Sequence, residues 1–113
     1  MTIKTLSATL SVAPQILPHQ IAGLAQAGFK SVICNLPDGE AGPRQPAFAE
    51  IAAAAKAAGM DAAYLPVRPG QAGPKEAAAF RELLDRLPAP VLAFCRSGNR
   101  SASLWAASQR VQG

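Results

Sequence analysis

This sequence of 113 residues has few of the residues from which metal and disulfide sites are usually built. His19 is its single histidine, and Cys34 and Cys95 are its two cysteines. Two cysteines do not make a disulfide framework, and their spacing is not that of a paired-cysteine metal site. One histidine excludes a histidine-rich zinc site. We therefore expect no metal ion and no other cofactor.

Aromatic residues make up only 5% of the chain, and the basic residues behind its net charge of +4 are scattered. Without basic and aromatic residues interleaved in one segment, we expect no nucleic-acid partner. No apolar run reaches the ~20 residues that span a bilayer, and residues 1–4 lack the apolar core of a signal peptide. We therefore expect a cytoplasmic protein with no membrane partner. Its mild positive charge suits a small anionic substrate.

Short apolar segments alternate with helical ones along the chain. Strands are predicted within 5–12, at 31–36, within 61–67 and at 91–94, the first with the alternation of a hairpin edge. Helices are predicted to begin at Pro18, Pro46, Pro74 and near Asn99, and Gly28 and Gly59 to end the first two. This pattern predicts one α/β domain over residues 1–113, with a mostly parallel central sheet flanked by helices. It does not give the order of the strands.

Three loops follow predicted strands, at residues 37–45, 68–73 and 95–101. In parallel sheets, ligands bind beyond the carboxyl ends of the strands. We therefore expect these three loops to meet and to form the active site.

The segment Phe94-Cys95-Arg96-Ser97-Gly98-Asn99-Arg100-Ser101 is the most informative part of the chain. It places a cysteine and an arginine at the two ends of a short loop, between a buried strand and a helix. Such a loop binds an anion or stabilises a thiolate, because its N–H groups and the helix N-terminus both carry positive charge. Cysteine often merely packs in a core, but the glycine, the hydroxyls and the arginine favour a reactive-cysteine site.

Other residues of this loop are candidates for contacts to the substrate anion. Ser101 is a candidate donor to the Cys95 thiolate or to the departing group, a role compatible with helix capping. Asn99 is either a cap or a substrate donor. Arg96 either attracts anions or is an ordinary surface residue. The full set of predicted anion-binding residues is Arg96, Ser97, Gly98, Asn99 and Ser101.

Two residues on the other loops are possible accessory residues. Asp38 is either a substitute general acid or a turn-forming residue. Arg68 is either a second contact to the anion or a member of a surface ion pair.

The chain as a whole resembles the phosphatase-like domain of the beta-lactamase hydrolase-like family, which is also described as a family of sulfur transferases. The resemblance lies in Leu-Ser-Val-Ala-Pro-Gln (10–15), Gly-Phe-Lys-Ser-Val-Ile (28–33), Asn-Leu-Pro-Asp-Gly-Glu (35–40) and the 95–101 loop. It implies a fold similar to that of cysteine-based dual-specificity phosphatases. It also implies that Cys95 is the nucleophile and Arg100 the clamp for the oxyanion.

The sequence departs from the phosphatase pattern at three points. Four residues separate Cys95 from Arg100, where tyrosine phosphatases have five, and Phe94 stands where they have histidine. No carboxylate lies in the Arg68-Pro69-Gly70 segment, where they carry their general acid. The loop looks instead like that of single-domain rhodanese sulfurtransferases.

These departures favour one reaction over another. Phosphate-ester cleavage gains about 10²–10⁴-fold from a general acid, whereas sulfur transfer from thiosulfate needs mainly a thiolate and a cationic cradle. The main prediction is a sulfurtransferase that carries sulfane sulfur as a Cys95 persulfide to an acceptor thiol or a partner enzyme. Its substrate is thiosulfate or a persulfide. The alternatives are a phosphatase that forms a phosphocysteine from a phosphate ester, and a non-catalytic anion-binding module.

Overall fold

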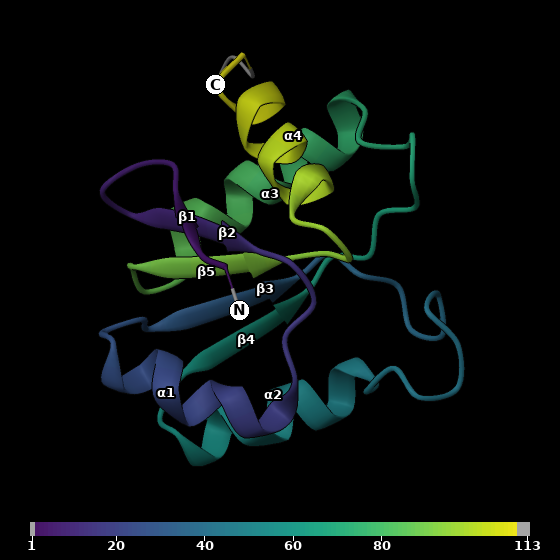
Figure 1. The fold of residues 1–113 in the computed structure, drawn as a ribbon. Helices are drawn as coiled ribbons and strands as arrows, with labels where there is room; N and C mark the ends of the chain where they lie inside the picture. The colour runs from purple at the N-terminus through teal and green to yellow at the C-terminus, as the bar shows by residue number, and fades with distance from the viewer. Residues whose placement is uncertain (1, 111–113) are drawn as a thin grey trace.

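The computed structural model describes residues 2–110, which fold into a five-stranded sheet flanked by helices (Figure 1). The strands are β1 (Lys4–Thr5), β2 (Leu10–Ala13), β3 (Ser31–Cys34), β4 (Asp61–Tyr64) and β5 (Val91–Phe94). The helices are the 3-10 turn η1 (Pro18–Gln20), α1 (Ile21–Gln26), α2 (Phe48–Ala57), α3 (Pro74–Arg86) and α4 (Asn99–Ser108).

The strand order β1-β2-β5-β3-β4 places β5 at the centre of the sheet. All neighbouring strands are parallel except β1, which pairs antiparallel with β2 as the predicted hairpin edge. Phe94 is in register with Ala13 of β2 on one side and with Cys34 of β3 on the other. Three strands thus end side by side, and Cys95 is the first residue beyond the central one.

Helices cover both faces of the sheet, as the alternating pattern predicted. Figure 1 shows α1 and α2 on one face and α3 and α4 on the other. Val32, Leu92 and Phe94 point into the core beneath α1 and α2. Ile33 and Ala93, their neighbours along the same strands, point into the core beneath α3 and α4. Burial on both faces explains why β3 and β5 are apolar apart from Ser31.

Several element ends differ from the prediction by a few residues. The helix predicted to begin at Pro46 is α2, which begins at Phe48, because Ala47 has extended backbone angles (φ −69°, ψ 156°). The strand predicted at 31–36 is β3, which ends at Cys34, and the chain then leads into the loop at 37–45. Gly28 and Gly59 do follow helices and have positive φ, as helix-ending glycines do. Among the described helices, none is long and apolar enough to cross a bilayer.

Candidate active site

Cys95 lies at the carboxyl end of the central strand and is completely buried. Its backbone N–H donates to the carbonyl oxygen of Ala13 over 3.4 Å, which continues the pairing of β5 with β2. Its sulfur accepts a hydrogen bond from the backbone N–H of Gly98 over 3.0 Å. The loop therefore folds back over the sulfur.

Gly98 is the residue that lets the loop turn back. It caps α4 with φ +94° and ψ −16°, in the left-handed region where side chains are disfavoured. A Cβ at this position would also lie 3.4 Å from the carbonyl carbon of Ala13. The hydroxyl of Ser97 accepts the N–H of Asn99, the first residue of α4, over 3.3 Å. The N-terminus of α4 thus begins beside the cysteine, as the sequence predicted.

Arg100, in the first turn of α4, makes a two-point ion pair with Glu40. Its Nη1 donates to Glu40 Oε1 over 2.7 Å, and its Nη2 donates to Oε2 over 2.6 Å. Nη1 also donates to the carbonyl oxygen of Val67 over 2.8 Å. The pair is largely shielded from solvent, with the two side chains 14% and 19% exposed. Arg100 is therefore in contact both with the loop at 37–45 and with the segment that follows β4.

The charges of this pair stabilise each other. The hydrogen bonds from Arg100 lower the pKa of Glu40 below its ordinary value. The same hydrogen bonds raise the pKa of Arg100 above its ordinary value. Glu40 is thus a carboxylate at neutral pH and has no proton to give.

Ser101 was a predicted anion contact, but the structure directs its hydroxyl elsewhere. The buried Oγ donates to Asn35 Oδ1 over 2.8 Å. Asn35 in turn donates through Nδ2 to the carbonyl oxygen of Leu65 over 2.9 Å and through its backbone N–H to that of Phe94 over 2.8 Å. In this structure Ser101 therefore fastens α4 to the ends of β3, β4 and β5, and its hydroxyl proton is not directed to Cys95.

Asn35 is a site residue that the sequence analysis missed. It is completely buried, and the partners of Asn35 belong to three different segments. The signal available in the sequence was a lone amide directly after an apolar strand, which needs partners if it is buried.

Asp38 holds the loop at 37–45 in place. Its carboxylate accepts the N–H of Phe48 at the start of α2 over 2.8 Å, and its own N–H donates to the hydroxyl oxygen of Tyr64 over 2.9 Å. The rings of Phe48 and Tyr64 stack with centroids 4.8 Å apart. Asp38 thus caps α2, which has no side-chain cap at Ala47. Its role as a general acid stays a prediction.

Arg68 and Arg96 are both exposed. Arg68 lines a hollow of about 280 Å³ beside the ion pair, together with Pro37, Asp38, Gly39, Glu40 and Pro69. The charge of Arg96 contributes to the lowered pKa of Glu40, which places it near the same end of the site. Their roles as anion contacts remain predictions.

Cys34 is buried at the end of β3, where its thiol has low reactivity. Burial raises the pKa of its thiol to about 12, although its hydrogen bond to the Leu36 carbonyl acts in the opposite direction. A thiol with such a pKa is protonated at neutral pH and is a poor nucleophile. Cys95 is therefore the better candidate for the nucleophile.

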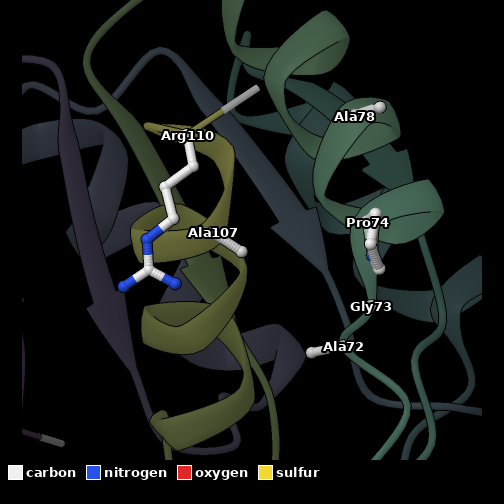
Figure 2. Close-up of a pocket in the computed structure, with 6 residues that line it drawn as sticks. All are labelled: Ala72, Gly73, Pro74, Ala78, Ala107 and Arg110. Carbon is white, nitrogen blue, oxygen red and sulfur yellow. The ribbon is translucent and has the colours of Figure 1, made fainter. Parts of the chain in front are cut away.

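A larger hollow of about 570 Å³ lies between the start of α3 and the end of α4 (Figure 2). Its walls are mostly small apolar side chains, and they include no residue of the 95–101 loop: Ala72, Gly73, Pro74, Ala78, Ala107 and Arg110. Within residues 2–110, no group of three or more His, Cys, Asp or Glu side chains is placed to hold a metal ion.

The mostly parallel sheet flanked by helices, with a cysteine and an arginine in the loop after its central strand, has the architecture of a cysteine-phosphatase-like α/β domain. The chain belongs to the family described as the beta-lactamase hydrolase-like protein, phosphatase-like domain, whose model matches residues 2–112. A beta-lactamase hydrolase-like protein of Agrobacterium fabrum is 34% identical over 104 residues, or 92% of this chain and 24% of the relative. One of Xylella fastidiosa is 30% identical over all of this chain and 26% of its own. The chain thus spans about a quarter of these relatives' length.

Solved structures show the same fold. A candidate phosphatase from Neisseria meningitidis is 36% identical and superposes with a TM-score of 0.86, over 93% of this chain and 74% of its own. Tk-PTP in its active form has a TM-score of 0.70 at 14% identity, over 97% of this chain and 76% of its own, which bears on the fold alone. The family description and the description of the Neisseria structure support the phosphatase alternative better than sulfur transfer, which they leave unconfirmed.

Proposed function

We propose that this domain is a cysteine-dependent enzyme in which Cys95 accepts a group from a small oxyanion held by Arg100, and that the group is sulfane sulfur. One observation carries the choice of group: both acidic side chains on the neighbouring loop are already engaged. Glu40 is ionised against Arg100, and Asp38 caps α2. The site therefore offers no ready acid for a leaving group, and sulfur transfer does not need one.

The reaction takes place in two displacements. The Cys95 thiolate attacks the outer sulfur of thiosulfate, the sulfur–sulfur bond breaks, and sulfite leaves with the bonding electron pair. Cys95 then carries a persulfide. The thiolate of an acceptor attacks its outer sulfur, takes that sulfur away as a new persulfide, and restores the Cys95 thiolate. The Gly98 N–H, which contacts Sγ, stabilises the negative charge of the Cys95 thiolate.

A cysteine-dependent phosphatase is the second candidate, and the family description and the Neisseria structure favour it. In this reaction Cys95 attacks phosphorus, the ester oxygen leaves, and water hydrolyses the phosphocysteine. Because no acid is free to protonate the departing oxygen, esters with good leaving groups such as p-nitrophenolate would react far faster than alkyl esters.

Intact-protein mass spectrometry distinguishes these candidates. After incubation with thiosulfate, we expect the wild-type chain and Cys34→Ser to gain one sulfur atom, and Cys95→Ser to gain none. Cyanide or a thiol should remove the added sulfur. Efficient turnover of phosphotyrosine peptides with no persulfide would replace sulfur transfer by the phosphatase reaction. Sulfate binding without either reaction would indicate an anion-binding module.

A further inference from the structure

Within residues 2–110, acceptors are present for three of the five N–H groups of the Arg100 guanidinium. Glu40 accepts one from each terminal nitrogen, and the Val67 carbonyl accepts the second one from Nη1. The two that remain are Nε–H and the second N–H of Nη2, which lie parallel on one edge of the planar group. That edge has the fork geometry that two oxygens of a tetrahedral anion match.

The position of Glu40 is itself fixed by its loop. Its backbone N–H donates to the carbonyl oxygen of Pro37 over 3.2 Å. The Gln45 side chain closes the same turn, because its Nε2 donates to the Pro37 carbonyl over 2.8 Å and its Oε1 accepts the N–H of Ala41 over 2.7 Å. Asp38 also binds the N-terminus of α2. Hydrogen bonds therefore fix the loop that carries Glu40, and its carboxylate is held in position next to Arg100.

We propose that Glu40 is a positioning residue that holds the Arg100 guanidinium with its free edge available to the substrate oxyanion. This inference rests on the proposed function, since it assigns to Arg100 the oxyanion of the donor. A long arginine side chain without such a partner samples many rotamers, and ordering it costs free energy at each binding event. The ion pair, with its lowered Glu40 pKa, keeps that order in place before the donor arrives.

Two readouts test this role, one of which does not depend on any reaction. Arginine side-chain NMR should show restricted rotation of the Arg100 guanidinium in the wild-type chain and fast rotation in Glu40→Gln. The matched control is Glu82→Gln, which removes an exposed carboxylate on α3 and should leave the Arg100 signal unchanged. The second readout is the rate of Cys95 persulfide formation at saturating thiosulfate, which we expect to fall about 10- to 100-fold in Glu40→Gln.

A second variant separates positioning from folding. In Glu40→Ala, formate can occupy the vacated space, and we expect it to restore the rate at least tenfold, with no such effect on Arg100→Lys. Equal guanidinium rotation in wild type and Glu40→Gln would overturn the inference, and so would a rate of persulfide formation in Glu40→Gln within twofold of wild type. A slow rate in Glu40→Ala that formate does not restore would also overturn it. If the wild-type chain forms no persulfide, the proposed function fails, and the NMR comparison still decides the role of Glu40.

Discussion

The backbone N–H of Gly98 points at the sulfur of Cys95 from 3.0 Å, and this contact sets the shape of the whole loop. Gly98 adopts positive φ to make it, next to the backbone of Ala13 at the end of β2. Cys95, the N-terminus of α4 and the end of β2 thereby meet at Gly98. Substitutions there should affect folding and chemistry together.

Gly98→Ala should destabilise the fold by about 1–2 kcal/mol, the cost of a left-handed conformation for an L-residue. The added Cβ would also make an ordinary van der Waals contact with the Ala13 backbone, 3.4 Å from its carbonyl carbon. Urea unfolding followed by circular dichroism measures the loss. Gly42→Ala is the matched control: its φ is also positive, but its Cβ would meet nothing within 4 Å. Equal losses in the two variants would show that contact with Ala13 adds nothing.

Arg100→Lys should reduce group transfer to Cys95 about 10²-fold while the domain stays folded. Lysine keeps the charge but cannot make the two parallel hydrogen bonds to Glu40 or to an anion. The rate of Cys95 modification, compared with the circular dichroism spectrum, gives the result. Wild-type rates in this variant would remove Arg100 from the mechanism.

Asp38 variants distinguish a helix cap from a general acid. Asp38→Asn keeps an oxygen that accepts the Phe48 N–H, so transfer rate and stability should both stay near wild type. Asp38→Ala loses that acceptor and should cost about 1 kcal/mol of stability. Rates of p-nitrophenyl phosphate and thiosulfate turnover are measured in both. If Asp38→Asn abolished phosphate-ester hydrolysis, Asp38 would be the acid and the phosphatase reaction would stand.

Cys34 should resist alkylation in the folded state, because burial raises its pKa to about 12. In a Cys95→Ser background, iodoacetamide at pH 9 should label Cys34 only when denaturant unfolds the chain. The raised pKa also means that stability is lost as pH rises above the unfolded thiol's value of about 8.5. Cys34→Ala should remove this alkaline slope. Rapid native labelling would contradict the assignment of Cys34 to the core.

The Glu40–Arg100 pair should stabilise the domain in a pH-dependent manner. The pKa of Glu40 is lower in the folded state than in the unfolded chain, so its contribution is present above about pH 4.3 and is lost as pH falls through the folded value. The difference in melting temperature between wild type and Glu40→Gln should therefore be larger at pH 7 than at pH 3. A difference independent of pH would mean that the carboxylate charge contributes nothing to stability.

The amino-acid sequence by itself determined the α/β class, the helix-covered parallel sheet and the Cys95–Arg100 loop, because local patterns carry these features. Apolar runs mark buried strands, prolines and glycines mark helix ends, and a cysteine and an arginine flank a glycine-containing turn. The structure confirmed these features. Only some element ends differ from the prediction, because the backbone angles of residues such as Ala47 determine where a helix begins.

Only the tertiary structure decided which side chains meet. The strand order brings Asn35 beside Ser101 and Glu40 beside Arg100, across 66 and 60 residues of sequence. No local pattern encodes such pairs, since they depend on which strand ends are neighbours. That is why Ser101 looked like a partner for Cys95 and Asp38 like a possible acid. In the folded chain Ser101 donates to the buried side chain of Asn35. Asp38 accepts the first N–H of α2, which has no partner within the helix.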